Sequence, residues 1–264
     1  MLAFETDCHI FSGCGFPAPG LHSFVFDPLF TVGGYEFNKP MLLALLSTVI
    51  VVWFFWAAFG KAKVVPGKLQ MIAEAGYDFV RRGIVYDALG KKEGEKYVPF
   101  IVSLFFFVWI MNIWSIIPIA QFPVTSIIAF PAGLAGIVYL TWMYLTFKKH
   151  GFVGGFKHLS GYDKSLGAVL PMIVVIEFLS NVFVRPFTHA VRLFANMFAG
   201  HLLLLMFTIG TWYLLNGVGI VYAGASFVMT VLLTAFELFI QAVQAYVFVL
   251  LTANYIQGAL AEQH

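Results

Sequence analysis

Long apolar runs separated by short polar segments organise this chain of 264 residues. Three runs, at residues 41–59, 98–117 and 124–147, have about 20 residues each, the length that a helix needs to cross the hydrocarbon core of a bilayer. The segment PIAQFP lies between the second and third runs and is typical of a tight turn. The pattern therefore predicts three membrane-crossing helices, the last two joined as a hairpin.

The last third of the chain carries two apolar runs of twice that length, at residues 166–209 and 220–261. About 40 helical residues are roughly 60 Å long, whereas the hydrocarbon core is about 30 Å thick. Because ordinary tilt cannot absorb this excess, either each run bends or the two form a steeply inclined hairpin that turns at WYLLNGVG. The sequence predicts an all-α integral membrane protein with five crossing helices, the last two long and tilted.

The polar segment after the first run has an amphipathic pattern. Its apolar residues fall on one helical face: Leu69, Ile72, Phe79, Val80 and Ile84. Charged residues fall on the opposite face: Glu74, Asp78, Arg81 and Arg82. This pattern predicts a helix that lies on the inner membrane surface.

Composition supports a membrane protein, because 61% of the residues are hydrophobic and only 11% are charged, against about 25% charged residues in soluble domains. Basic residues gather in residues 60–97 and 148–164, whereas residues 1–40 hold one lysine and four acidic residues. Cytoplasmic loops collect Lys and Arg. We therefore expect a multi-pass protein of the cell membrane with its N-terminus outside and its C-terminus in the cytoplasm. The absence of a basic segment before the first run argues against a cleavable signal.

These features divide the chain into an outer tail (residues 1–40), three membrane helices with the inner amphipathic segment (41–165), and the long hairpin (166–264). The outer tail contains the two cysteines, Cys8 and Cys14. The sequence is compatible both with a disulfide between these two cysteines, which would close a small loop, and with two free thiols.

Charged residues inside the apolar sequence of the hairpin are the main candidates for function: Glu177, Arg185, Arg192 and Glu237. A charge at the centre of a membrane helix costs about 2.5–3.5 kcal/mol on insertion scales and usually marks an ion path, a sensor or a counter-ion. We interpret Arg185, which precedes Pro186, as a candidate for an interface or lipid headgroup role together with His189. Glu177 is a candidate for a wet path to the inner side.

Arg192 is the most demanding of these charges, because a guanidinium does not lose its proton in a protein. No carboxylate lies one helical turn away, and Thr188, Ala195 and Ala199 give its face small side chains that let another helix approach. We therefore interpret Arg192 as the partner of a carboxylate on another subunit. The alternative is a structural arginine that snorkels to the surface or pairs with Glu177.

The second helix of the hairpin carries a polar stripe of Glu237, Gln241 and Gln244 at i, i+4 and i+7. Glutamines also join membrane helices by hydrogen bonds, so a structural role is the alternative to a hydrated proton path. His201 lies about 13 Å beyond Arg192 by helical rise, near the expected level of Glu237. Imidazole titrates near neutral pH, so a His201–Glu237 pair suits proton exchange.

The segments VRLFANMFAGH and FELFIQAVQAYVFVLLTANYI resemble subunit a of the F-type ATP synthase, and the resemblance covers nearly the whole chain. The outer tail and the inner segment are actinobacterial in style. The resemblance implies that Arg192 faces the proton-carrying carboxylate of the rotating c-ring, with Asn196 and Gln244 nearby. His201 and Glu237 match a pair in the outer half-channel, with acid and imidazole exchanged relative to many bacterial members.

The resemblance further implies that Glu177 belongs to the inner half-channel, although its spacing to Pro186 is one residue longer than in some relatives. Protons would pass from the outer half-channel to a c-subunit carboxylate and leave at the inner one, where Arg192 favours the ionised carboxylate. The implied partners are the c-ring, subunit b, the other ATP synthase subunits and membrane lipids. No nucleic acid, metal or cofactor is expected. The chain has no phosphate-binding Gly-x-x-x-x-Gly-Lys-Ser/Thr loop, so we expect nucleotide chemistry on other subunits.

Two other classes of function remain to be weighed. A redox protein would use His189 and His201 as haem ligands, but the closing helix offers no facing histidine before His264. A solute transporter would show inverted repeats and broken helices, which the sequence does not display.

Overall fold

The computed structural model describes these parts of the chain: residues 16, 18–20, 24, 26, 28–32, 35–60, 63–117, 120–161, 170–215 and 219–261. Within them the regular secondary structure is helical apart from one antiparallel hairpin of β1 (Phe30–Val32) and β2 (Tyr35–Phe37). Cys8 and Cys14 lie outside the described residues. Their pairing stays a prediction.

The three shorter apolar runs form α1 (Lys39–Phe59), α4 (Val98–Ile113) and α5 (Ala129–Leu159). Helix α4 ends four residues before its apolar run does, because the chain turns there and the Phe122 N–H donates to the Trp114 carbonyl at 3.2 Å. The third run begins with a 3-10 turn, η3 (Val124–Ser126), before α5 starts. The predicted positions of these helices are confirmed.

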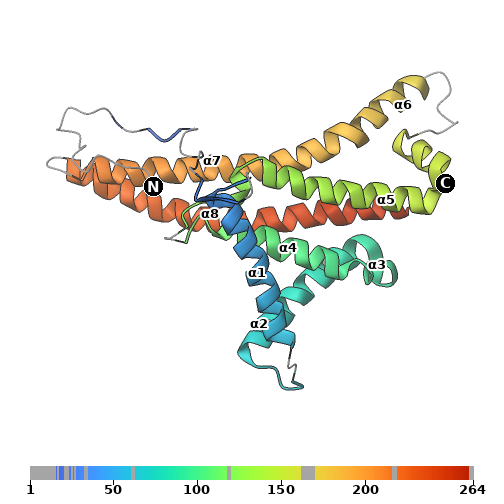
Figure 1. Ribbon diagram of the computed structural model, residues 1–264, viewed down its shortest axis with the longest axis horizontal. Coiled ribbons are helices and arrows are strands. Elements are labelled where there is room, and N and C mark those ends of the chain that lie inside the picture. The colour runs from blue at the N-terminus through green and yellow to red at the C-terminus, as the bar shows by residue number, and fades with distance from the viewer. Residues whose placement is uncertain are drawn as a thin grey trace.

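Helix α5 continues past the predicted end of its run and changes direction at Gly151, whose φ is 70°. This backbone conformation favours glycine, which has no Cβ to clash. The rest of α5 turns back toward the α6 side, as Figure 1 shows at the end of the molecule that carries the C-terminus.

The long hairpin consists of α6 (Leu170–Leu179), a π-helical segment η5 (Ser180–Val184), α7 (Arg185–Tyr213) and α8 (Ile220–Leu260). Helices α6 and α7 form one helical stretch of 44 residues. Pro186 lacks an N–H and its ring would clash with the carbonyl four residues earlier. The π-helical turn before it relieves this conflict, and Figure 1 shows α6 diverging from the line of α7.

Helix α8 is the centre of the bundle. It runs beside α7 and also contacts α4, α5 and α3. Its protein-facing side is made of small or apolar residues that are fully buried, among them Ala245, Val249, Ala253 and Ile256. The opposing residues Leu193 and Met197 of α7 are also buried, so α7 and α8 pack closely along their length.

Within the described residues, four helical stretches are long and apolar enough to cross a membrane: α1, α5, α6–α7 and α8. Helix α4, with 16 residues, is a shorter apolar helix. The predicted all-α membrane fold with a long closing hairpin is therefore confirmed.

The inner amphipathic segment differs from the single helix that was predicted. It consists of α2 (Lys68–Val80), a π-helical segment η2 (Arg81–Tyr86) and α3 (Asp87–Gly94). Val80 and Ile84 are fully buried, whereas the other residues of the predicted apolar face are exposed: Leu69, Ile72 and Phe79. The division between exposed and buried residues already falls within α2, and the buried Ile84 follows in the π-helical turn.

Candidate functional site

Arg192 lies on α7 with its side chain exposed. Among the described residues it makes no hydrogen bond and no ion pair. Glu177, the intrachain partner suggested as an alternative, belongs to α6 and forms no ion pair with it. The guanidinium is therefore free to meet an anion that another molecule supplies.

The surface around Arg192 is small and mostly apolar. Thr188, Ala195, Asn196 and Ala199 are all exposed on α7. The Thr188 hydroxyl donates to the Val184 carbonyl at 2.7 Å, so its polar group is already used within the helix. A partner helix can approach this face closely, because only the arginine and one amide project from it.

A second polar group is buried between α7, α8 and the end of α4. Glu237 is 5% exposed, His201 is 3% exposed, and Gln241 is fully buried. The Gln241 Nε2 donates to the Ser115 Oγ at 2.5 Å and reaches the Glu237 Oε1 at 3.5 Å. Gln244, the third residue of the predicted stripe, is half-buried.

Glu237 faces α7 beside the histidine but does not bond to it. Its Cγ lies 4.0 Å from the position that a Cβ of Gly200 would occupy, one residue before His201. The Glu237 Oε2, the Gln241 Oε1 and the His201 Nδ1 are buried without a hydrogen-bond partner in the described part of the chain. All three atoms can form a hydrogen bond with water, and the carboxyl of Glu237 and the imidazole of His201 can also exchange a proton.

Further buried polar residues extend this cluster. The Thr125 Oγ1 of η3 donates to the Asn112 Oδ1 of α4 at 2.5 Å, and both residues are fully buried. The Ser126 Oγ donates to the Pro123 carbonyl at 2.7 Å. None of these residues was a candidate from the sequence, although Asn112 is a polar residue in an otherwise apolar run and so carries a recognisable signal.

Aromatic rings enclose His201. Phe24 and Phe122 meet the imidazole edge to face with centroid distances of 5.8 and 5.7 Å, and Phe24 lies 4.5 Å from the ring of Phe198. Phe24 precedes α1, so the segment before α1 packs against the middle of α7 at the histidine. The sequence did not predict this contact.

Glu177 occupies the other end of the hairpin and is exposed on α6. Gly161 lies so close that a Cβ there would overlap the Glu177 carboxylate, and the φ of Gly161 is 57°. The Asn181 Nδ2 donates to the Leu159 carbonyl at 2.8 Å. The end of α5 is thus fastened to α6 beside Glu177, so one side of this carboxylate is covered.

Arg185 and His189 differ in exposure, although the sequence gave them the same candidate role. Arg185 is exposed and lies 5.9 Å above the ring of Tyr255, which suits a headgroup or interface contact. His189 is 3% exposed and stacks against Phe248 with a centroid distance of 4.0 Å. His189 therefore packs against α8 within the bundle, and the interface or headgroup role of both residues stays a prediction.

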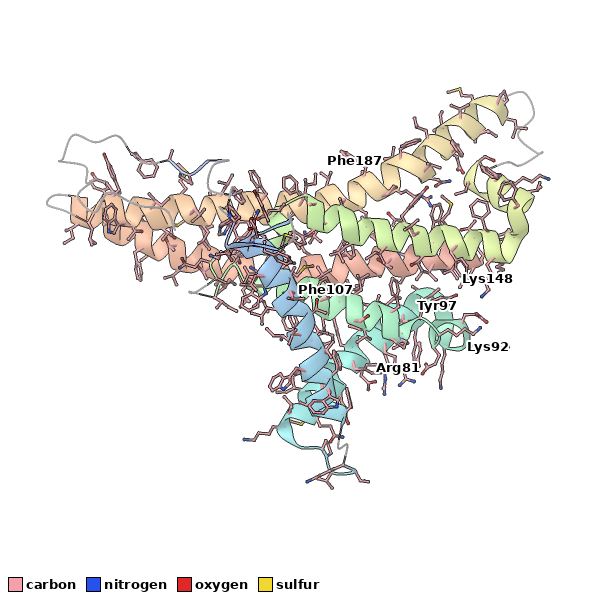
Figure 2. The ribbon with its side chains drawn as sticks, in the orientation of Figure 1. Arg81, Lys92, Tyr97, Phe107, Lys148 and Phe187 are labelled. Carbon is pink, nitrogen blue, oxygen red and sulfur yellow. The ribbon has the colours of Figure 1, made fainter. Side chains whose placement is uncertain are left out.

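The inner segment holds a separate ionic cluster outside the membrane helices. The Arg81 Nη2 donates to the Glu95 Oε1 at 2.7 Å, and the Tyr86 hydroxyl donates to the other carboxylate oxygen. The hydrogen bond from Tyr86, followed by that from Arg81, holds the pKa of the Glu95 carboxyl below its usual range. Figure 2 shows Lys92 and Lys148 at the end of the molecule opposite the α7–α8 turn.

Residues 41–257 match the model of the family described as "ATP synthase A chain". The chain belongs to this family. Similar proteins named "ATP synthase subunit a" include one from Streptomyces lividans, 74% identical over all of this chain and 95% of the relative. Another, from Pseudarthrobacter chlorophenolicus, is 42% identical over 94% of this chain and 95% of the relative.

A third member of the ATP synthase A chain family, from Frankia alni, is 41% identical over 94% of this chain and 87% of its own length. Membership confirms the resemblance stated from the segments around Arg192 and Glu237. It agrees with a membrane subunit that carries no catalytic chemistry of its own. Within the described residues there is no group of three or more His, Cys, Asp or Glu side chains that could hold a metal ion.

Proposed function

We propose that this chain is the proton-translocating stator subunit of an ATP synthase membrane sector and that Arg192 faces the carboxylates of a rotating c-ring. The observation that carries the proposal is an exposed arginine on a face of small residues, without an anionic partner in the described part of the chain. A permanent cation at membrane depth is costly. A carboxylate that arrives on another subunit offsets that cost.

The outer half-channel in this proposal is the buried cluster of Glu237, His201, Gln241 and Ser115. Its unpartnered oxygen and nitrogen atoms give protons successive sites across α7 and α8. Asn112 and Thr125 continue the polar surface from the end of α4. Protons reach a c-subunit carboxylate from this cluster, and the neutral acid then enters the lipid.

The inner half-channel in this proposal begins beside Arg192 and leads past Glu177. The guanidinium favours the ionised form of the arriving carboxylate, so the proton is released there. The same fixed charge repels hydronium, which prevents direct passage between the two half-channels. Asn196 and Gln244 are the polar groups that accompany Arg192 at the rotor contact. Each proton that crosses 100 mV contributes about 2.3 kcal/mol to rotation.

The remaining partners in this proposal are subunit b, the other ATP synthase subunits and membrane lipids. The cell membrane is the site of action, with the N-terminus outside and the C-terminus in the cytoplasm. The gathering of Lys92 and Lys148 at the end opposite the α7–α8 turn supports this orientation, because basic residues collect on the cytoplasmic side.

The test is the Arg192→Ala variant, measured in the complete complex in membrane vesicles. We expect proton-driven ATP synthesis to fall to background while the subunit still assembles, because the arginine makes no contact that the fold requires. Arg82→Ala is a matched control, since Arg82 is also exposed but pairs with Asp78 on the inner segment. Retained synthesis in Arg192→Ala would refute the proposal.

A further inference from the structure

A small cavity lies between α5, α7 and α8, and its lining includes one of the two arginines of α7, Arg185. It provides about 10 Å³ of space for a water-sized sphere. Its polar lining comes from Tyr139 of α5, Arg185 and His189 of α7, and Tyr255 of α8, and apolar side chains of α5 with Pro186 complete the wall. The proton path proposed above does not use this cavity.

Two buried polar atoms in this lining lack a partner. The Nε2 of His189 and the hydroxyl of Tyr139 are both inaccessible, and neither forms a hydrogen bond within the described ranges. The His189 ring is held between Phe248 at 4.0 Å and Tyr255 at 5.6 Å, so it has little freedom to turn toward another acceptor. Buried polar atoms are almost always paired with protein or with ordered water, so these two require a ligand.

The volume of the cavity and the charge of its lining residues determine which ligand fits. A space of about 10–15 Å³ for a water-sized sphere holds one water molecule and nothing larger. Arg185 is part of the cavity lining and lies 5.9 Å from the ring of Tyr255. This permanent cation disfavours sodium or hydronium in the cavity. A neutral water therefore fits the site best.

We propose that this cavity binds one water molecule, hydrogen-bonded to the His189 Nε2 and the Tyr139 hydroxyl, which fastens α7 to α5 within one helical turn of Arg192. His189 precedes Arg192 by three residues and so lies in the same helical turn. Rotation of α7 about its axis would turn Arg192 away from its exposed edge, and the bridge opposes this rotation. His189 and Tyr139 are thus positioning residues, a role that rests on the proposed function of Arg192.

The direct test is a map of the complete complex at a resolution that shows ordered water. We expect a peak within about 2.7–3.2 Å of both the His189 Nε2 and the Tyr139 hydroxyl. In a Tyr139→Phe complex the peak should be lost, while Tyr144→Phe, an exposed tyrosine on the same helix, should leave it in place. A direct hydrogen bond from His189 to the protein, or no peak in the cavity, would overturn the proposal.

A functional test compares His189→Leu, Tyr139→Phe and the double variant. Each single variant should lower the rate of proton-driven ATP synthesis about tenfold, the value of roughly one buried hydrogen bond. Because both residues hold the same water, the double variant should lose no more than either single one. His189→Gln, which keeps a polar nitrogen near the same place, should recover most of the rate.

Two outcomes would refute the water bridge: losses that multiply in the double variant, or a Gln variant as impaired as the Leu variant. Both are independent of the Arg192→Ala result. If Arg192→Ala retains synthesis, the rotor-facing role fails, whereas the occupancy of the cavity in the map still decides whether the water site exists.

Discussion

Arg192 and Glu237 are both charged residues within apolar helices of one hairpin, but their surroundings are opposite. Arg192 is exposed on a face of small side chains and meets no anion among the described residues. Glu237 is 5% exposed and lies within a cluster that includes Gln241 and Ser115. The region around Glu237 is built within the chain, whereas the region around Arg192 is one side of an interface.

This difference predicts how each region tolerates change. Arg192 must keep its charge, because no neighbouring group can replace it. Glu237 acts within a cluster of polar groups, so its carboxyl and the imidazole of His201 can exchange helices and still exchange protons. The predictions below test this contrast.

The largest effect is expected for Arg192→Lys. A lysine without water around it can lose its proton, whereas an arginine cannot, so the rotor-facing charge would be lost despite the conservative change. Proton-driven ATP synthesis in vesicles should fall to near background. Arg185→Lys is the matched control on the same helix and should keep most of the rate. Normal synthesis in Arg192→Lys would show that any cation suffices there.

The next largest effect concerns His201 and Glu237 in the enclosed region. Alanine at either position should lower the rate of synthesis about a hundredfold, the lower end of what a positioned proton-transfer group contributes. The double exchange His201→Glu with Glu237→His should be less damaging, because both groups remain in the cluster. Equal losses in the exchange and the alanine variants would argue against a shared task.

A smaller effect is expected for Gln241→Leu. The change removes the donor to Ser115 and to Glu237 and leaves buried oxygen atoms unpaired, which costs about 1–3 kcal/mol. The thermal midpoint of the detergent-solubilised complex should fall. Gln257→Leu alters an exposed glutamine of the same helix and should not lower it. Equal midpoints would mean that the Gln241 bonds contribute nothing net.

A smaller effect again is expected for Gly161→Ala, beside the exposed Glu177 at the inner end of the hairpin. The new Cβ would overlap the Glu177 carboxylate, and the φ of 57° is strained for alanine. Glu177 must then move, and we expect a few-fold slower passive proton conduction through the membrane sector. Gly133→Ala, where a Cβ meets nothing within 4 Å, is the control and should leave conduction unchanged. Unchanged conduction in both variants would exclude Glu177 from the path.

The smallest effect lies outside the membrane helices, at Glu95. Because its pKa is lowered in the folded chain, its contribution to stability is present above the usual carboxyl pKa of 4.5 and is lost as the pH falls through the lower folded value. Limited proteolysis of the α2–α3 segment should therefore accelerate at acidic pH in the parent protein. Glu95→Gln should be cleaved faster at neutral pH and show less change on acidification. The same acid response in both proteins would contradict this account.

The sequence was sufficient for the features that depend on local pattern. Apolar run length predicted the helices and the long hairpin, and the lack of a nearby carboxylate singled out Arg192. The enclosure of His201 was not predictable in this way, because Phe24 and Phe122 come from distant segments and no periodicity links them to α7. The roles assigned to these residues stay predictions.

In the inner segment, the hydrophobic pattern did not predict which apolar residues are buried. A constant helical period placed Phe79, Val80 and Ile84 on one face, but Phe79 is exposed while Val80 and Ile84 are buried. The segment also contains a π-helical turn, η2, which begins directly after Val80. Such a turn has no simple sequence signature, since it depends on what the neighbouring helices accommodate. The burial of His189 was missed for a related reason, because Phe248 and Tyr255 reach it from another helix.

The second π-helical turn, η5, lies between Glu177 and Pro186. A wider turn takes up one additional residue without rotating the helix on either side of it. The hairpin can therefore gain or lose a residue at this point while the acid of α6 and the arginines of α7 keep their directions. The number of residues between Glu177 and the arginines of α7 can therefore change, whereas the relative orientation of these side chains cannot.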